Sequence, residues 1–531
     1  MISTKRAYRG MVVAPHHLAA QAGLRVLTDG GNAIEAMVAA AATVAVVYPH
    51  MNGLGGDCFW LIRTPGGEMI GIDACGAAAG LASVDHYLEQ GHGAIPSRGP
   101  LAACTVAGAV SGWAEALAVA GAHGARLPLG RLLEDALWHA RNGIATSASQ
   151  VENTLAKLGE LGGVPGFAET YAPEGIGAVR VGGRLRQARL ADTLGRLAEA
   201  GLDDFYRGDL AATIGRELEG AGSPLRTADL ERHTARRVTP LSVRVGPGTV
   251  HNLPPPTQGL ASLLILGIVD RLGLAQDDRC FDYVHRLVEA TKVAFAIRDR
   301  HVTDPGRMRV DPASFLTDDA IAELAAKVDR HVAAPWGTPA AGGDTVWLGA
   351  IDRDGMAVSF IQSLYWEFGS GLVLPSTGIV WQNRGTSFGL RDDAVNRLEP
   401  GAKPFHTIQP PMAVLDDGRV VVYGTMGGDG QPQTQAMLLT RHAYLGLPPQ
   451  AAVSAPRWLL GRTWGDSATS LRVERRMPEK TMAALRAAGH PVEVIDEYDS
   501  LTGHAGMLVR HPDGLLEGGA DPRSDGTVAA W

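Results

Sequence analysis

The sequence comprises 531 residues, of which 45% are apolar and 20% are charged, and its formal net charge is −8. This composition is typical of a globular chain, and the length indicates two or more domains or one large composite domain. Because the charge balance is acidic and no basic patch stands out, we expect no nucleic-acid partner.

The cysteines and the N-terminus indicate the cellular compartment. Cys58, Cys75, Cys104 and Cys280 form no CxxC pair and no metal-ligand spacing, so we interpret them as mostly buried small side chains in a reducing compartment. Residues 1–17 contain no apolar signal-peptide core. The longest apolar run, 36–48, is shorter than the roughly 20 residues that a membrane helix needs. We therefore expect a cytoplasmic protein without a membrane partner.

The front of the chain is predicted to alternate strands and helices. The segment 32–47 is Ala-rich and apolar on nearly all sides, so this helix should be central in the fold. A Gly-Gly stop signal separates it from the helix before it. In chain order we expect a strand at 10–13, helices at 17–29 and 32–47, and a β-hairpin formed by 58–62 and 69–72.

A glycine-rich turn, Gly53-Leu54-Gly55-Gly56, lies between the central helix and the hairpin. Such turns can cradle phosphate, but no Lys-Ser/Thr pair follows this one and the GxGxxG spacing is not met. We therefore predict no nucleotide site here. The simpler interpretation is a tight turn in which backbone approaches backbone.

Residues 108–330 are predicted to be mainly helical, with helices of about 10–15 residues. The run Pro254-Pro255-Pro256 forms a rigid break before one of these helices. The expected helices cover 110–120, 130–141, 151–160, 190–200, 208–221, 259–272, 280–302 and 318–328.

The character of the chain changes at Thr345. A loop-like run rich in Ala, Pro and Gly covers 333–343, and apolar strands follow at 346–351 and 356–361, joined by a turn at Asp354-Gly355. A threonine at a boundary between loop and strand is ordinary when it stands alone. The same arrangement also suits a chain that cuts itself.

A threonine in this position can attack its own backbone. Its hydroxyl can add to the carbonyl of the preceding residue, and cleavage there leaves a residue with both a nucleophilic hydroxyl and a basic amine. An α-amino group has a pKa of about 7.7–8.0, so a useful fraction is unprotonated at neutral pH and can act as general base. The local pattern leaves both interpretations of Thr345 open.

The rest of the chain returns to strands and shorter helices. Strands at 412–415 and 419–423 flank a hairpin turn, Gly427-Gly428 occupies the next turn, and a helix is expected over 433–444, with two later helices near 450 and 479. Strands, then helices, then strands in one long chain predict an α+β layered fold with helices outside stacked sheets.

Taken together, these motifs resemble the γ-glutamyltranspeptidase family of N-terminal-nucleophile hydrolases. The resemblance covers most of the chain and rests on the order and spacing of several motifs. They are Gly30-Gly31-Asn32-Ala33, Gly53-Leu54-Gly55-Gly56, Asp344-Thr345, Phe368-Gly369-Ser370-Gly371, Gln382-Asn383-Arg384-Gly385, Pro404-Phe405-His406-Thr407 and Met426-Gly427-Gly428-Asp429. The runs 426–435 and 455–458 are typical of the branch that includes oxamate amidohydrolases and glutathione-hydrolase-like proteins.

The resemblance implies a four-layer αββα sandwich made from a precursor that cuts itself between Asp344 and Thr345. It would divide the chain into a large segment, 1–344, and a small segment, 345–531, which together form one composite domain. The implied partners are a small-molecule amide substrate and the two fragments of the same precursor. The oligomeric state stays open, with a homodimer among the alternatives.

The resemblance also implies catalytic roles by position. Thr345 matches the nucleophile, and Ser363 falls where the family has a hydroxyl that hydrogen-bonds it. Gly427 and Gly428 match the turn whose N–H groups bind the developing oxyanion, and such donors stabilise a transition state by roughly 3–4 kcal/mol each. Without the resemblance, Ser363 would be an ordinary strand residue and the glycine pair a plain turn.

Substrate-binding positions depart from the family pattern. γ-Glutamyl enzymes hold the α-carboxylate with an Arg and a Ser pair, and the α-amino group with an Asn and an Asp. Here Val84 aligns with the Arg, His406 and Thr407 with the Ser pair, Tyr365 with the Asn, and Ser387 with the Asp. Without the Asp, a buried ammonium group would lack its charge partner, which is costly.

Polar and cationic groups nevertheless remain. Arg98 and Arg384 each offer a planar fork that suits a carboxylate, and His406 and Thr407 add polar atoms. The alternative for either arginine is a structural ion pair. We therefore expect a pocket for a small carboxylate-bearing amide.

Three functions remain under consideration. The first is a self-processing amidohydrolase that acts on a substrate such as oxamate, and the second is a γ-glutamyl hydrolase or transpeptidase acting on glutathione-like compounds. The third is an unprocessed binding protein. No HExxH or paired Cys/His pattern indicates zinc, and Ser370 lacks the GxSxG context, so we expect no metal and no cofactor.

Overall fold

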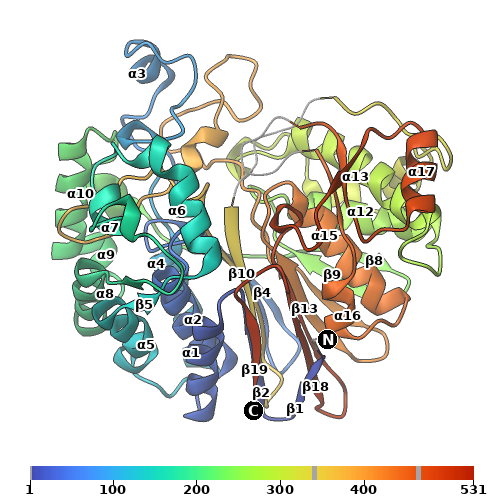
Figure 1. Cartoon of the computed structure of the whole chain (residues 1–531), viewed down its shortest axis with the longest axis horizontal. Coiled ribbons are helices and arrows are strands. Elements are labelled where there is room, and N and C mark those ends of the chain that lie inside the picture. Colours follow the sequence, from blue (N-terminus) through green and yellow to red (C-terminus); the bar gives the residue numbers. More distant parts are fainter. Residues whose placement is uncertain (1–2, 338–343, 462–467) are drawn as a thin grey trace.

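The computed structural model describes residues 3–337, 344–461 and 468–531. Within these residues, two seven-stranded antiparallel sheets pack face to face, and helices cover the outer face of each sheet (Figure 1). The predicted αββα sandwich is therefore confirmed. The loop predicted at 333–343 lies outside the described residues from 338 onward.

The first sheet, called sheet I below, has β10 near its centre, with β2 on one side and β11 on the other. The strands predicted at 346–351 and 356–361 are confirmed as β10 and β11, and the predicted hairpin as β3 and β4. In sheet order the strands are β19 (Thr527–Ala530), β2 (Gly10–Ala14), β10 (Asp344–Asp352), β11 (Ala357–Tyr365), β3 (Asp57–Arg63), β4 (Met69–Ala74) and β7 (Arg236–Val238).

The prediction that 108–330 is mainly helical is confirmed, but the second sheet, called sheet II, contains strands from this region that were not predicted. It includes a hairpin from that region, in which Val243, Val245 and Val250 alternate with more exposed residues. In sheet order the strands are β1 (Lys5–Ala7), β18 (Leu516–Ala520), β17 (Ala505–Arg510), β13 (Val420–Thr425), β12 (Met412–Leu415), β9 (Gly248–Asn252) and β8 (Leu241–Val245).

The helices outside sheet I come from the first half of the chain (Figure 1). Every residue of α2 is buried, as its all-round apolar sequence predicts, and Asn32 and Glu35 form a capping box at its start. These helices are α1 (His17–Thr28), α2 (Ala33–Val47), α4 (Ala109–Ala122), α5 (Leu129–Asn142), α6 (Ala148–Leu161), α7 (Phe167–Tyr171), α8 (Ala188–Ala200), α9 (Asp204–Arg207), α10 (Asp209–Ala221) and α11 (Thr227–Arg232). A short helix, α3 (Val84–Leu88), projects at the top of Figure 1.

The helices outside sheet II are α12 (Gly259–Leu272), α13 (Phe281–His301), α14 (Asp318–Ala325), α15 (Gly430–Leu439), α16 (Pro449–Ser454) and α17 (Glu479–Ala487). The helix predicted at 433–444 begins earlier, at Gly430, and ends in a π-helical turn over Thr440–Tyr444. A small sheet of β14 (Trp458–Leu460), β15 (Leu471–Glu474) and β16 (Val492–Ile495) and a pair, β5 (Ile144–Ala145) with β6 (Arg184–Leu185), complete the described strands. None of the helices described is both long enough and apolar enough to cross a membrane.

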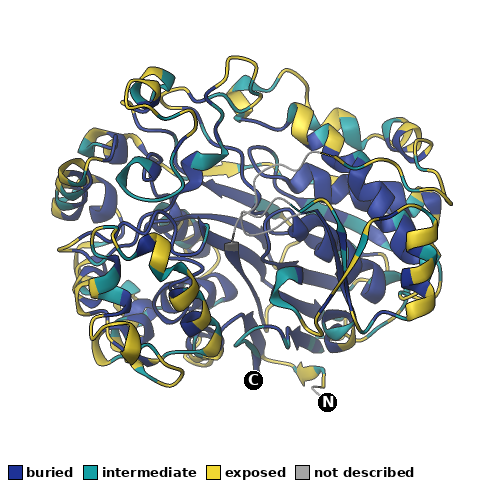
Figure 2. Ribbon diagram, turned by 45° about the horizontal axis from the view of Figure 1, so that its top comes forward, coloured by how far each residue is buried: buried dark blue, intermediate teal, exposed yellow. Residues whose placement is uncertain are grey.

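The central strands of both sheets are buried, whereas exposed residues gather on the outer helices and loops and on the edge strands β1 and β7 (Figure 2). Because side chains alternate along a strand, every second residue of β10, β11 and β3 faces sheet II. Trp347, Ile361 and Phe59 lie in this inter-sheet core. Thr345 and Ser363 lie two residues further along their strands, so the same alternation places them at the edge of the face towards sheet II.

Candidate active site

Thr345 lies at the start of β10 and is 1% exposed. Its Oγ1 donates a hydrogen bond to Ser363 Oγ on β11 at 3.3 Å. A β-bulge at this point shifts the register between β10 and β11, and the N–H of Tyr365 donates to the same Ser363 oxygen at 2.8 Å. The two hydroxyls predicted to act together are therefore adjacent in the fold.

Gln431, which was not predicted from the sequence, also contacts the hydroxyl of Thr345. Gln431 lies in the first turn of α15, and its Nε2 donates to Thr345 Oγ1 at 3.4 Å. This contact brings the N-terminus of α15 towards the nucleophile, and a helix N-terminus carries partial positive charge that favours an anion. The signal available in the sequence was the run 426–435, which contains this residue.

Gly427 and Gly428 form the turn immediately before α15. Their φ values are 117° and 53°, a region that favours glycine, and the N–H of Gly430 donates to the Gly427 carbonyl at 2.7 Å. This conformation lets consecutive amides converge on one point, which is what an oxyanion site requires.

A buried polar network holds that turn in place. Gln258 donates from Nε2 to the carbonyls of Thr407 (2.6 Å) and Gly428 (2.8 Å). Arg298 on α13 in turn donates to Gln258 Oε1 and to Asp429 Oδ1, both at 2.8 Å. Burial alone would lower the pKa of Arg298, but the Asp429 and Asp299 carboxylates raise it, so the guanidinium stays charged.

The glycine turn at 53–56 supports the site from the side of β3. A Cβ at Gly56 would lie 2.2 Å from the carbonyl oxygen of Ser363, and one at Gly55 would lie 2.1 Å from the carbonyl oxygen of Val380. These glycines therefore allow backbone to approach backbone. The interpretation of this segment as a tight turn is confirmed.

Arg384 is 1% exposed and lies in the 3₁₀ turn Arg384–Ser387. Its guanidinium stacks 3.7 Å above the ring of Tyr365, and Nη1 donates to the Phe405 carbonyl at 3.4 Å. Among the side chains described, no carboxylate comes within 4.0 Å of it, and Nη2 has no hydrogen-bond acceptor. Burial lowers its pKa to about 10, so the group remains a cation at neutral pH.

His406 and Thr407 lie beside this arginine and are fully buried. His406 Nε2 is 3.5 Å from Oδ2 of Asp57, and its ring meets Phe59 edge to face at 5.0 Å. Burial, aided by Arg384, holds the pKa of His406 well below its usual range, so its imidazole is neutral. Thr407 Oγ1 has no partner in the described structure.

The other two predicted binding residues have different surroundings. Arg98 donates to Glu160 at 2.8 Å and to the carbonyls of Glu367 and Gly369 at 2.7 and 2.5 Å, so its fork is occupied in holding the loop after β11. Ser387 donates to the Arg384 carbonyl at 3.1 Å. These contacts favour a structural role for Arg98 and a supporting role for Ser387.

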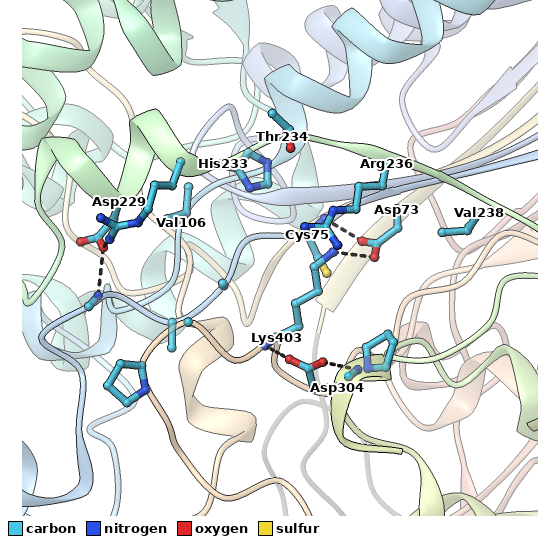
Figure 3. Close-up of a pocket in the computed structure, with 18 residues that line it drawn as sticks. Asp73, Cys75, Val106, Asp229, His233, Thr234, Arg236, Val238, Asp304 and Lys403 are labelled. Atoms are coloured by element: carbon cyan, nitrogen blue, oxygen red, sulfur yellow. Dashed lines mark hydrogen bonds and ion pairs between the residues drawn. The ribbon is translucent and has the colours of Figure 1, made fainter. Parts of the chain in front are cut away.

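A pocket of about 560 Å³ lies along the segment that leads to His406 (Figure 3). Lys403 anchors this segment, because its Nζ donates to Asp73 and its N–H to Asp304, both at 2.6 Å. Among the described residues that line the pocket, none is Thr345 or a neighbour that hydrogen-bonds it. We therefore assign this cavity to the support of the site and not to the reaction itself.

One group of side chains within the described residues could in principle hold a metal ion: His285, Glu289 and His490. However, His285 Nδ1 and His490 Nε2 already share a hydrogen bond at 2.8 Å. The Lys292 ammonium donates to Glu289 at 2.7 Å, placing a positive charge where a cation would bind. The donor set therefore does not fit a metal ion.

Thr345 lies at the start of a central strand in one of two packed sheets, beside a glycine turn at a helix N-terminus. This arrangement is typical of the hydrolases that use an N-terminal nucleophile. Comparison with known proteins agrees. The sequence pattern described as gamma-glutamyltranspeptidase matches residues 19–531. The chain therefore belongs to the γ-glutamyltranspeptidase family, and it is an amide-hydrolysing enzyme of that family.

Individual relatives cover essentially the whole chain. It is 55% identical to the oxamate amidohydrolase proenzyme of Klebsiella pneumoniae subsp. pneumoniae, with 100% of both chains covered. It is 42% identical to a glutathione hydrolase-like proenzyme of Bacillus subtilis, with 99% of each covered. Among solved structures, cephalosporin acylase from Bacillus halodurans superposes with a TM-score of 0.91 at 34% identity, covering 100% of this chain and 97% of that one.

Proposed function

We propose that the chain cuts itself between Asp344 and Thr345 and then hydrolyses the amide of a small carboxylate-bearing substrate. The first part rests on the position of Thr345 at the start of β10, with Ser363 and Gln431 hydrogen-bonded to its hydroxyl. Both sheets contain strands from either side of this peptide bond, so the segments 1–344 and 345–531 would remain one folded body after the cut.

Self-cleavage proceeds in two steps. Thr345 Oγ1 attacks the Asp344 carbonyl carbon, the peptide C–N bond breaks, and the proton lost by the hydroxyl goes to the departing amine. Water then hydrolyses the resulting ester, which leaves the Asp344 carboxylate and restores the hydroxyl of Thr345. The product carries a free α-amino group on the same residue as its nucleophile.

Amide hydrolysis uses the same atoms. The unprotonated amine of Thr345 accepts the hydroxyl proton, Oγ1 attacks the substrate carbonyl, and the N–H groups of Gly427 and Gly428 stabilise the oxyanion. The amine then returns the proton to the leaving nitrogen, and an acyl-enzyme forms. Water releases the acid and regenerates Thr345.

The substrate class rests on one observation, the buried guanidinium of Arg384 without a carboxylate partner among the described side chains. A buried cation without a hydrogen-bonded anion is costly, and a substrate carboxylate would supply such an anion to Arg384. Arg384 stacks on the ring of Tyr365, whose backbone N–H donates to Ser363, so these contacts connect the cation to the hydroxyl beside the nucleophile. We therefore propose oxamate, cleaved to oxalate and ammonia, as the kind of substrate hydrolysed.

A γ-glutamyl substrate is the second candidate, and the 42% identical glutathione hydrolase-like relative favours it. Such a substrate needs an anion for its ammonium group, and the corresponding position holds Ser387, whose hydroxyl donates to Arg384. The deciding experiment measures ammonia release from oxamate beside p-nitroaniline release from a γ-glutamyl anilide. Turnover of the anilide alone would refute the oxamate-like preference.

We also propose a cytoplasmic location for the enzyme. All four cysteines are free thiols, and three of them are buried. Cytoplasmic proteins keep their thiols reduced, whereas secreted proteins commonly pair them. Fractionation of the native host, followed by immunoblotting of each fraction, tests this location.

A further inference from the structure

Asp57, the first residue of β3, is a buried carboxylate that the mechanism above does not use. It pairs across the sheet with Ser363, and side chains directly opposite each other share a face, so its carboxylate projects towards sheet II beside the nucleophile's neighbour. The N–H groups of Gly76 and Gly108 donate to its Oδ1 at 3.0 and 2.9 Å. These two hydrogen bonds fix the orientation of the carboxylate.

The second oxygen of Asp57 has a different environment. Among the described groups Oδ2 has no hydrogen-bond partner within 3.5 Å, although the nearby Gln382 side chain lowers the pKa of Asp57. Nε2 of His406 lies 3.5 Å from Oδ2. A buried carboxylate oxygen without a donor disfavours the charged form. If Asp57 is protonated, Oδ2–H can instead donate to the neutral imidazole of His406.

The same carboxylate supplies negative charge to Arg384. Asp57 raises the pKa of that guanidinium, which burial lowers, and Arg384 in turn acts on Asp57. Without substrate, the charge of one buried cation is therefore offset by that of one buried anion. A substrate carboxylate on Arg384 would bring a second anion into this enclosed space.

We propose that Asp57 balances the charge of Arg384 in the empty site and takes up a proton when an anionic substrate binds. This inference rests on the proposed carboxylate-binding function of Arg384. It makes Asp57 a positioning residue that sets the pH range over which the enzyme holds its substrate.

The titration of the surrounding groups agrees with this assignment. Burial raises the pKa of Asp57 to about 7, so it changes charge near neutral pH. His406 stays neutral there because its pKa is lowered. The raised pKa values of the Cys58 and Cys75 thiols and of the Tyr206 phenol keep these three groups protonated. Lys403 and Asp73 form an ion pair. The titratable groups around Asp57 are Arg384, His406, Lys403, Asp73, Cys58, Cys75 and Tyr206.

Substrate affinity should fall as the pH rises through the pKa of Asp57. Below the pKa of the free enzyme, Asp57 is already protonated and binding needs no further proton. Above it, each substrate anion brings a proton with it, so affinity falls by up to about tenfold per pH unit until the higher pKa of the complex is reached. The amine of Thr345 titrates in the same region in the cleaved enzyme, so binding is a cleaner measurement than turnover.

The experiment is calorimetric titration of the cleaved enzyme with pyruvate, which matches oxamate in shape and charge but has no leaving nitrogen. Titrations between about pH 6 and pH 9, in buffers of different ionisation enthalpy, give the number of protons taken up. For the wild type we expect uptake rising towards one proton at high pH. Asp57→Asn keeps the acceptor for Gly76 and Gly108, so we expect it to abolish uptake and bind about tenfold more tightly than wild type one pH unit above the pKa.

A matched control is Asp352→Asn, which changes another buried carboxyl group at the opposite end of β10, with hydrogen bonds from Ala33 and Met356. It should take up protons as the wild type does. Pyruvate binding without proton uptake, in an enzyme that still hydrolyses oxamate, would overturn the role of Asp57 and leave the proposed function intact. Absence of both pyruvate binding and oxamate turnover would overturn the proposed function, and this inference with it.

Discussion

Replacing Arg384 by methionine distinguishes the effect of this residue on the stability of the fold from its effect on catalysis. Methionine fills a similar volume without charge. Because no described carboxylate lies within 4.0 Å of Arg384, removing it relieves the desolvation of a buried cation. The losses are the cation–π contact with Tyr365 and the longer-range attraction to Asp57, which protonation of Asp57 offsets. We expect the melting temperature of the variant to be unchanged or higher.

Activity should respond in the opposite way. Two charge-assisted hydrogen bonds to a substrate carboxylate, at about 1.5–2 kcal/mol each, amount to about 3–4 kcal/mol, or a factor of about 10²–10³ in kcat/KM. Self-cleavage should continue, since that step requires no carboxylate ligand. The assay is ammonia release from oxamate, with calorimetric melting and a denaturing gel on the same preparation.

Arg98→Met is the matched control. This arginine is also largely buried, but its fork holds Glu160 and two carbonyls of the loop after β11, so its loss should lower the melting temperature. If Arg384→Met melts lower than Arg98→Met and retains full oxamate turnover, Arg384 is a structural residue and the substrate argument fails.

Three further predictions follow from the described contacts. Ser363→Ala should slow both self-cleavage and turnover by about fivefold to tenfold, because it removes one hydrogen bond of roughly 1 kcal/mol at Thr345. Time courses on gels would measure the rate of self-cleavage. Rates equal to those of the wild type would contradict the role of Ser363. Gly427→Ala places a side chain at φ 117° and should lower kcat by about 10²–10³ by disturbing the oxyanion turn. A rise in KM with kcat unchanged in steady-state kinetics would instead mean that the turn only binds substrate. His504 is buried, and burial lowers its pKa to about 4. Below pH 6.5 the unfolded chain therefore binds more protons at this residue than the folded protein does. The free energy of unfolding should fall by up to about 1.4 kcal/mol per pH unit as the pH drops from 6.5 towards 4. His504→Gln should reduce that acid dependence in urea titrations, and an unchanged slope would refute the assignment.

The sequence was most informative where local pattern and packing agree. Segment 32–47 is apolar on all sides, and it became the fully buried helix α2 with the capping box that Asn32 and Glu35 encode. The strand predicted at 346–351, which lies within β10, was equally clear, because a loop-like run gives way there to an apolar one. The hairpin of β8 and β9 was missed, although the alternation of Val243 and Val245 with more polar residues carried the signal of a half-buried strand.

Contacts between segments far apart in the chain could not be read from the sequence. Arg98 and Arg384 were equivalent candidates for a carboxylate, and only their partners in the fold distinguish them. Asp57 followed a glycine turn without further distinction, yet the fold places it beside His406. Its environment depends on burial and on charges from several elements, which no local pattern encodes.

Mass spectrometry of the purified protein tests the central claim most directly. We expect two fragments that meet between Asp344 and Thr345 in the wild type, and a single intact chain without oxamate turnover for Thr345→Ala. An intact wild-type chain that hydrolyses oxamate, or an alanine variant that still matures and turns over, would contradict the proposed mechanism.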